Sequence, residues 1–169
     1  MQGLKMPDGL NIRPANHADN PFLEKLHHST RQDLQLIDAD KEVVESIMEL
    51  QLKAQTQGYG SQFPNAMYFV VERHCEPIGK VTVDFGHNEV RLVDLALIPA
   101  ARGKGLGAEI IRAFQQAATM VAVPMTLSVM QSNFPAKALY QKLGFVTASV
   151  EIPYELMVWS PPAMKLIQI

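Results

Sequence analysis

Apolar and polar residues follow two different spacings along this 169-residue chain. Short apolar runs rich in β-branched and aromatic side chains predict strands over residues 10–15, 66–72, 77–84, 89–98, 125–130, 145–150 and 154–159. Apolar residues at helical spacing predict a helix that begins at Asp19–Asn20 and further helices over 40–57, 105–120 and 133–143. We therefore expect an α/β (α+β) fold, with a central mixed, mostly antiparallel sheet of about seven strands and helices on both faces.

The composition favours one globular domain over residues 1–169. Hydrophobic residues make up 47% of the chain and charged residues 19%, and no linker, repeat or low-complexity segment interrupts the pattern. No apolar run reaches the roughly 18 to 20 residues that a membrane helix needs. Residues 1–9 lack the apolar stretch of a secretory signal, and the single cysteine, Cys75, is expected in a turn between strands. A cytoplasmic location is therefore expected, because a lone cysteine forms no internal disulfide.

Charge is distributed unevenly along the chain. Residues 1–100 hold 14 acidic residues against 9 Lys and Arg, whereas residues 101–169 hold 3 acidic residues against 6 Lys and Arg. No Asp or Glu occurs between Ile110 and Val150. The missing carboxylates fit an anionic ligand near this half, and they fit equally a half that is more deeply buried.

A glycine-rich loop joins the predicted strand at 89–98 to the helix at 105–120. It reads Pro99-Ala-Ala-Arg-Gly-Lys-Gly-Leu-Gly-Ala108, with glycines at 103, 105 and 107. Glycines let backbone N–H groups crowd toward one point, and a helix N-terminus adds unpaired N–H groups and the positive end of the helix dipole. The loop therefore suits a phosphate or pyrophosphate, with Arg102 and Lys104 adding positive charge.

Other interpretations of this loop fit less well. Glycines also tighten ordinary turns, but three that alternate with basic residues favour a ligand. Gly103–Ala108 matches G-x-G-x-x-A, yet no acidic residue occurs in 121–130, where a dinucleotide fold places its ribose ligand. A P-loop is excluded because Lys104 is followed by glycine and not by Ser or Thr.

Two segments together resemble the GNAT superfamily of N-acetyltransferases. Arg102-Gly-Lys-Gly-Leu-Gly107 resembles its R/Q-x-x-G-x-G/A signature, and Asp94–Pro99 is similar to its fourth strand. Asn133-Phe-Pro-Ala-Lys-Ala-Leu-Tyr-Gln-Lys-Leu-Gly-Phe145 resembles its N-x-x-A-x-x-L-Y-x-x-x-G-F helix at every defining position. The resemblance covers about residues 66–150, with a weaker match at 12–15, and implies a GNAT-like fold.

The resemblance implies that acetyl-CoA lies in a cleft where the fourth and fifth strands splay apart. Its pyrophosphate would lie on the loop, and backbone groups near Leu95 and Leu97 would pair with the pantetheine arm and polarise the thioester carbonyl. The expected cofactor-binding residues are Leu95, Leu97, Arg102, Gly103, Lys104, Gly105, Leu106, Gly107, Asn133, Ala136 and Tyr140.

Tyr140 is the expected general acid in this resemblance. A phenol with an ordinary pKa near about 10 is protonated at neutral pH and can protonate the departing CoA thiolate. An ordinary half-buried helix tyrosine remains the alternative.

The general base is left open between two carboxylates and water. Asp94 lies in an apolar stretch, which suggests either a polar cleft or a basic partner. Glu89 lies at a strand start, where we expect it to be solvated. His87 is expected to be an ordinary turn residue, and a water chain can replace a single base.

The acceptor side, within the first 65 residues, is less informative. Segments 27–33 and 55–63 are expected to border the acceptor cleft, and the acidic character of this half fits a cationic amine. No third ligand supports a metal at His27–His28, and no basic stripe interleaved with aromatics indicates nucleic acid, so we expect no metal, nucleic-acid or membrane partner. A homodimer through the C-terminal strands is compatible with exposed residues at Pro161–Pro162 and Leu166–Ile167.

Three functions follow from these motifs. The first is direct transfer of acetyl from acetyl-CoA to a primary amine of a small molecule or peptide. The second is a non-catalytic acyl-CoA-binding module, and the third is a transferase that uses another acyl-CoA such as succinyl-CoA.

Overall fold

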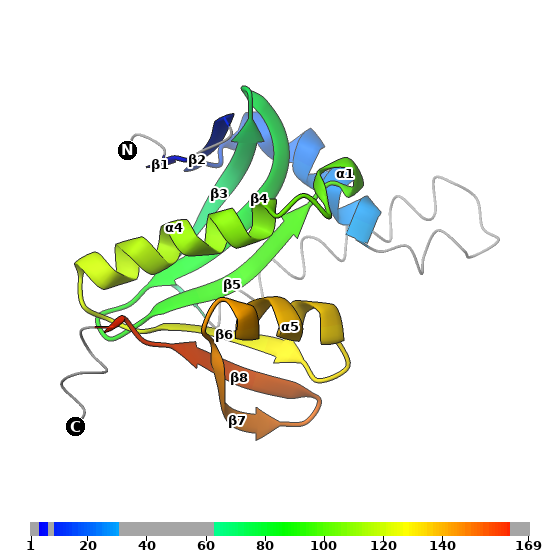
Figure 1. Ribbon diagram of the computed structural model, residues 1–169. Helices are drawn as coiled ribbons and strands as arrows, with labels where there is room; N and C mark the ends of the chain where they lie inside the picture. The colour runs from blue at the N-terminus through cyan, green and yellow to red at the C-terminus, as the bar shows by residue number, and fades with distance from the viewer. Residues whose placement is uncertain (1–3, 7–8, 31–62, 163–169) are drawn as a thin grey trace. The chain divides into compact units, whose positions relative to one another are not determined.

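The computed structural model describes residues 4–6, 9–30 and 63–162 (Figure 1). The chain divides into two compact units that alternate along the sequence, Met1–Thr82 with Asp94–Lys104, and Val83–Val93 with Gly105–Ile169. The predicted helix over 40–57 lies outside the described residues. A single domain over 1–169 stays a prediction.

The first unit contains the N-terminal strands and helix α1. Its elements are β1 (Leu4–Lys5), β2 (Leu10–Pro14), the 3-10 helix η2 (His17–Asp19), α1 (Asn20–Thr30), β3 (Ala66–Arg73), most of β4 (Glu76–Phe85), the end of β5 (Val90–Leu97) and the 3-10 helix η3 (Pro99–Ala101). Strand β2 pairs antiparallel with both β1 and β3. Its core is formed by buried apolar side chains of the strands and of α1, among them Leu10, Ile12, Leu26, Val70, Val71 and Val81.

A two-residue turn joins β3 to β4, as the sequence predicted. His74 and Cys75 have φ angles of 51° and 68°, and both side chains are exposed. Two consecutive positive φ angles produce the hairpin turn whose twist matches that of the flanking strands. Cys75 is therefore a turn residue with a free thiol.

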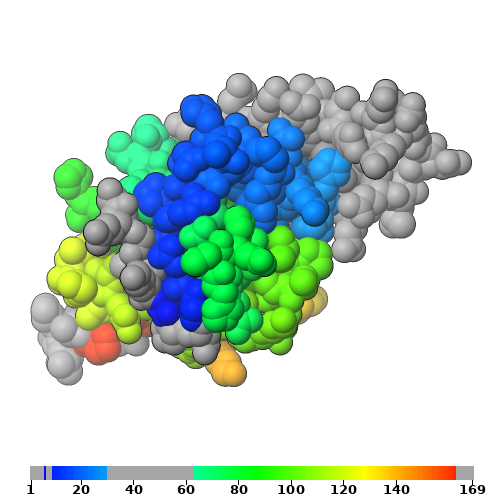
Figure 2. Space-filling view, turned by 90° about the horizontal axis from the view of Figure 1, so that it is seen from above, coloured from blue at the N-terminus to red at the C-terminus, as the bar shows by residue number. Residues whose placement is uncertain are grey.

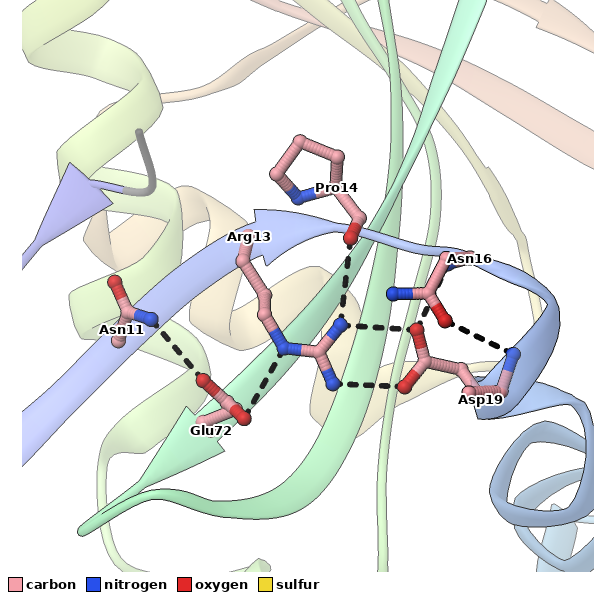
Figure 3. Close-up of polar contacts among 7 residues, drawn as sticks. Asn11, Arg13, Pro14, Asn16, Asp19 and Glu72 are labelled. Carbon is pink, nitrogen blue, oxygen red and sulfur yellow. Dashed lines mark hydrogen bonds and ion pairs between the residues drawn. The ribbon is translucent and has the colours of Figure 1, made fainter. Parts of the chain in front are cut away.

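A largely buried ion-pair network fixes the start of the first unit (Figure 3). The Arg13 guanidinium donates two hydrogen bonds to Asp19, at 2.7 and 2.9 Å, and its Nε lies 3.1 Å from Glu72 Oε2. Asp19 also accepts from the backbone N–H of Asn16 at 2.8 Å. Arg13 thus joins β2 to β3 and to η2. In the space-filling view of Figure 2, residues 9–30 form one continuous stretch of surface, coloured blue.

A short 3-10 turn precedes the first helix. Asn16 caps this turn, η2, because its side chain accepts from the Ala18 N–H at 2.9 Å. Asp19 pairs with Arg13 and completes a capping box, and α1 begins at Asn20 directly after η2. The sequence placed the helix start correctly but missed the extra turn and the role of Arg13.

The second unit is built around a parallel pair of strands and their crossover helix. Its elements are the start of β5, α4 (Leu106–Met120), β6 (Met125–Met130), α5 (Phe134–Lys142), β7 (Val146–Glu151) and β8 (Tyr154–Trp159). Strand β8 pairs antiparallel with both β6 and β7. The predicted inner face of α4 is confirmed, since the side chains of Ile110, Ile111, Phe114 and Ala118 are all buried.

The strand order by hydrogen-bonded neighbours is β1-β2-β3-β4-β5-β6-β8-β7. Parallel pairing of β5 with β6 and antiparallel pairing at both ends confirm the predicted mixed sheet. The eighth strand, beyond the seven expected, is the two-residue β1, which is too short to carry a periodic signal. No helix among the described residues is long and apolar enough to cross a membrane. The cytoplasmic location stays a prediction.

The Arg13–Asp19 pair generates a pH-dependent stability. The hydrogen bonds from Arg13 lower the pKa of Asp19 below its ordinary value, despite the opposing effect of burial. This contribution is fully present above the unfolded-state pKa and is lost as pH falls through the lower folded-state pKa. We expect Asp19→Asn to lower the free energy of unfolding by about 2–4 kcal/mol at neutral pH, and the difference from wild type to shrink below about pH 4.

Urea unfolding over this pH range checks the prediction. Glu109→Gln serves as the control, since Glu109 pairs with Arg112 on the exposed side of α4 and is expected to matter by less than about 1 kcal/mol. A difference between Asp19→Asn and wild type that did not change with pH would contradict the ion-pair explanation.

Candidate functional site

Strand β5 pairs with β6 over only the first part of its length. The parallel ladder between them joins Val90–Leu92 to Met125–Leu127 and comprises three residue pairs. Leu95 and Leu97, the predicted cofactor-binding residues of β5, lie beyond this ladder and are half-buried. Backbone groups there lie outside the β5–β6 register, as an added extended ligand requires.

Gly79 on β4 allows β5 to approach closely at this point. A Cβ at Gly79 would lie 2.5 Å from the Ala96 carbonyl oxygen and 2.6 Å from a methyl carbon of Leu97. The Ile98 N–H donates to the Ile78 carbonyl at 2.8 Å. The end of β5 is therefore held against β4 by backbone contact.

Asp94 has a basic partner. Its Oδ2 lies 3.2 Å from Lys80 Nζ, and the two side chains are only 20% and 14% exposed. The sequence left a polar cleft and a basic partner equally open, and the structure shows the partner. Asp94 is thus a charged carboxylate beside an ammonium group, and its role as a base stays a prediction.

Arg102 is held at the end of β5. Its Nε donates to the Leu97 carbonyl oxygen at 3.0 Å, and its backbone N–H donates to the Pro99 carbonyl at 3.2 Å. The Leu97 carbonyl already accepts this hydrogen bond, so a ligand would share it or use a different backbone group. Arg102 keeps its charge at an exposed position of the loop.

The three glycines of the loop differ in whether their backbone conformation requires glycine. Gly103 and Gly105 have φ angles of 74° and 77°, which L side chains rarely adopt. Gly107 lies in the first turn of α4, where its conformation requires no glycine. A Cβ at any of the three would meet no described atom within 4 Å. Space beside the backbone is therefore open at each glycine, as a closely approaching ligand requires.

The N-terminus of α4 presents backbone donors. No side chain caps it, and the first helical bond runs from the Glu109 N–H to the Gly105 carbonyl at 3.2 Å. The N–H groups of Leu106, Gly107 and Ala108 consequently have no partner within the helix. The Leu106 side chain is buried, so only its backbone can reach a ligand. Uncapped N–H groups and exposed Lys104 favour an anion here.

Asn133 caps helix α5, as predicted. The Asn133 side-chain oxygen accepts from the Ala136 N–H at 3.4 Å. Its oxygen therefore caps the helix, and its NH₂ group is the part that can donate to a cofactor. Ala136 is half-buried on the first turn.

Tyr140 is half-buried and lies against a core ring. Its ring meets that of Phe145 edge-on, with centroids 5.9 Å apart and an interplanar angle of 60°. The Phe145 N–H donates to the Tyr140 carbonyl at 3.0 Å, and Phe145 is only 2% exposed. Gly144 has a φ of 98°, and a Cβ there would meet the Trp159 ring at 3.0 Å. The phenylalanine of the motif thus packs against Tyr140, and its glycine allows close approach of Trp159.

Glu89 accepts a hydrogen bond and is less exposed than the sequence suggested. Its Oε2 accepts from the Thr126 hydroxyl at 2.7 Å, and the side chain is half-buried instead of freely solvated. Arg91 donates to Ser128 Oγ at 2.7 Å on the same pair of strands. Burial lowers the pKa of the Arg91 guanidinium from its ordinary value, and the nearby charge of Glu89 opposes this shift.

The remaining candidates are placed as follows. His87 is exposed in the turn after β4, and His27 and His28 lie in the last turn of α1. Among residues 4–6, 9–30 and 63–162, no group of three or more His, Cys, Asp or Glu side chains could hold a metal ion. Pro162 is exposed, but Pro161 is buried, contrary to expectation, because it packs at the end of β8.

Several sequence candidates lie outside the described residues. These are Leu166–Ile167, residues 31–33 of the acceptor segment 27–33 and residues 55–62 of the acceptor segment 55–63. Of the site residues, the first unit holds Asp94, Leu95, Leu97, Arg102, Gly103 and Lys104, and the second holds Glu89, Gly105, Leu106, Gly107, Asn133, Ala136 and Tyr140.

Two charged partners were not singled out by the sequence. Lys80 pairs with Asp94 across strands, and Lys137 pairs with Glu155 at 2.9 Å. Both pairs join residues far apart in the chain. No local spacing signals them, because the partners meet only after the strands and helix α5 have folded.

Comparison with known proteins identifies relatives of this chain. The family model described as Acetyltransferase (GNAT) family matches residues 31–145. The Beta-lysine N(6)-acetyltransferase of Methanosarcina mazei is 23% identical over 144 residues, covering 83% of this chain and 48% of the relative. The chain therefore spans about half the length of that curated relative.

Solved structures show a similar fold. An acetyltransferase from Thermus thermophilus has a TM-score of 0.67 at 23% identity and covers 92% of this chain and 99% of its own. The PaiA N-acetyltransferase from Thermoplasma acidophilum, in complex with coenzyme A, has a TM-score of 0.65 at 17% identity and covers 89% and 98%. These similarities confirm the predicted fold class.

We expect substitution by alanine to have opposite effects on stability at two of the loop glycines. Gly105→Ala is expected to destabilise the fold by about 1–2 kcal/mol, because alanine is strained at positive φ. Gly107→Ala is expected to stabilise it by about 0.5–1 kcal/mol, because glycine costs more conformational entropy in a helix. Urea unfolding of the two variants checks this. Since both positions have open space beside the Cβ, equal effects would contradict the conformational explanation.

Proposed function

This chain belongs to the acetyltransferase (GNAT) family, and we propose that it transfers the acetyl group of acetyl-CoA to a primary amine by direct attack in a ternary complex. The acceptor is a small molecule or a peptide. The observation that carries this proposal is the uncapped N-terminus of α4, which is flanked by Gly103, Gly105 and Gly107, all with open space beside their backbones. The relatives support acetyl-CoA as the donor, since one of them was solved with coenzyme A.

We propose that the loop binds the pyrophosphate of the donor. Backbone N–H groups of Gly105, Leu106 and Gly107 donate to phosphate oxygens, and Arg102 and Lys104 neutralise their charge. Backbone groups near Leu95 and Leu97 pair with the pantetheine arm, a role supported by their place beyond the β5–β6 ladder. A backbone N–H there polarises the thioester carbonyl as charge develops on its oxygen.

The transfer forms one carbon–nitrogen bond and breaks one carbon–sulfur bond. The neutral amine nitrogen attacks the thioester carbon, and the carbon–sulfur bond then breaks as the carbonyl re-forms. The acceptor ammonium and the tetrahedral intermediate release protons, and the CoA thiolate takes one up. Tyr140 donates a proton to the sulfur and is reprotonated from solvent.

The proton acceptor is one of two carboxylates or a water chain. Glu89 keeps one oxygen for Thr126, and its other oxygen can accept a proton directly or through water. Asp94 Oδ2 already lies 3.2 Å from Lys80 Nζ, so an acceptor ammonium group would have to share or displace that contact. We therefore favour Glu89 over Asp94 as the base.

The acceptor class is a cationic amine. The acidic balance of residues 1–100 supports attraction of a positive charge. One relative carries the name of a β-lysine acetyltransferase, which makes β-lysine, lysine and a short peptide with a free N-terminal amine the first compounds to test.

Steady-state acetylation of this panel, with wild type and Tyr140→Phe, tests the function. We expect Tyr140→Phe to lower kcat by about 10²-fold or more and to leave acetyl-CoA affinity within a few-fold, because the phenol acts on the leaving sulfur. Tyr154→Phe is the control, since Tyr154 is an exposed tyrosine of the same unit, 49% accessible.

Each outcome of this experiment is decisive. Acetyl-CoA binding without turnover of any amine would indicate a non-catalytic acyl-CoA module. A parallel titration with succinyl-CoA that gave tighter binding would indicate another donor. Failure of every CoA ester to bind would overturn the proposed function.

A further inference from the structure

Helix α5, which carries Tyr140, is held by little apolar packing. It spans nine residues, none of its side chains is fully buried, and Phe134 at its start is 71% exposed. The 15-residue α4 of the same unit, in contrast, buries a complete stripe that includes Ile110, Ile111 and Phe114. A nine-residue helix is marginal in isolation and depends on its attachments. The polar contacts of α5 therefore decide its orientation.

The central attachment is the ion pair between Lys137 and Glu155. Lys137 Nζ lies 2.9 Å from Glu155 Oε2, and the two side chains are 20% and 12% exposed. The Oε2 atom is inaccessible to solvent and accepts no hydrogen bond of good geometry from the described residues, so the nearby Lys137 ammonium group is its compensating contact. Lys137 Nζ also lies over the Phe134 ring, 5.9 Å from its centroid.

Glu155 is a rigid anchor for this pair. It lies on β8, where it is opposite Val129 of β6 on one side and opposite Val150 of β7 on the other. A strand paired on both sides does not shift without breaking two ladders. Figure 1 shows α5 in orange beside this part of the sheet. The ion pair therefore ties the orientation of α5 to a strand that is held on both sides.

Lys137 and Tyr140 are three residues apart on α5. Residues at this spacing lie on one side of a helix, with Cβ atoms about 5–6 Å apart. The far end of the helix is held separately, because Gln115 Nε2 of α4 donates to the Leu143 carbonyl at 3.0 Å. Tyr140 lies between these two attachments and against Phe145. Loss of the Lys137 contact would let the first turns of α5 rotate about the Leu143 end.

We infer that Lys137 is a positioning residue, which through Glu155 holds the Tyr140 hydroxyl in line with the leaving sulfur. This inference rests on the acid role of Tyr140 proposed above. Lys137 touches neither substrate in this account and acts only through the orientation of α5. Because proton transfer depends steeply on geometry, the effect falls on kcat and not on binding of the donor.

Three variants at the pair and one control test this inference. Lys137→Met keeps the stem but removes the charge, Glu155→Gln removes the opposite charge, and Lys137→Arg keeps the pair. Lys142→Met is the matched control, since Lys142 is exposed in the last turn of the same helix. We expect kcat to fall about 10-fold for the first two variants with KM for acetyl-CoA within about 2-fold, and to stay near wild type for Lys137→Arg and Lys142→Met.

A double-mutant cycle with Tyr140→Phe separates positioning from a general loss of stability. If Lys137 acts through the Tyr140 hydroxyl, Lys137→Met lowers kcat in wild type but not further in the Tyr140→Phe background. An equal loss in both backgrounds, or a Lys137→Met variant that matches Lys142→Met, would overturn the inference. The charge-reversed variant with Lys137→Glu and Glu155→Lys together is expected to recover part of the lost kcat.

A readout without turnover keeps this inference distinct from the proposed function. Tetranitromethane nitrates accessible phenols, and peptide mass spectrometry reports the rate at Tyr140 in the full chain. We expect Lys137→Met to raise this rate several-fold and Lys142→Met to leave it unchanged. Unchanged nitration would overturn the positioning role, whereas changed nitration with a Tyr140→Phe variant of normal kcat would refute only the acid role.

Discussion

The parallel pairing of β5 with β6 is the constraint on which the candidate site depends. Parallel neighbours cannot be joined by a hairpin, so the chain must leave the end of β5, cross over through α4 and return to start β6. The connection that enters α4 therefore begins at the carboxyl end of β5. Because the ladder with β6 stops after three residue pairs, the last residues of β5 lie outside that register.

The two helices of the second unit are held in different ways. Helix α4 has a continuous apolar stripe, and its burial fixes the N-terminus that presents backbone donors. Helix α5 lacks such a stripe and is positioned by Asn133, Gln115 and the Lys137–Glu155 pair. The two helices of this unit thus differ in whether apolar burial or polar contacts hold them.

Several charged residues of the described strands pair with residues of other strands. Arg13 joins Glu72, Lys80 joins Asp94, and each pair is partly buried. Buried carboxylates are costly without such partners. A carboxylate in an apolar stretch is consequently a weak sign of a catalytic base, as Asp94 shows, until its neighbours across the sheet are known.

The sequence by itself determined the elements and the family resemblance. Periodicity, turn residues and caps are local, so the strands, α4, α5 and the turn at Cys75 were predicted close to their observed bounds. The glycine loop and the Asn133–Phe145 motif were recognisable for the same reason, since each lies within one short segment. The start of α1 was also correct, although the short 3-10 turn before it was missed.

Only the tertiary structure decided which side chains meet. The pairing of Asp94 with Lys80, of Glu89 with Thr126 and of Lys137 with Glu155 brings together residues 14, 37 and 18 positions apart. The order that places β8 between β6 and β7 was equally absent from the local pattern. Local spacing fixes the face on which a side chain lies, but its partner depends on strand register and helix rotation, which are set by packing across the fold.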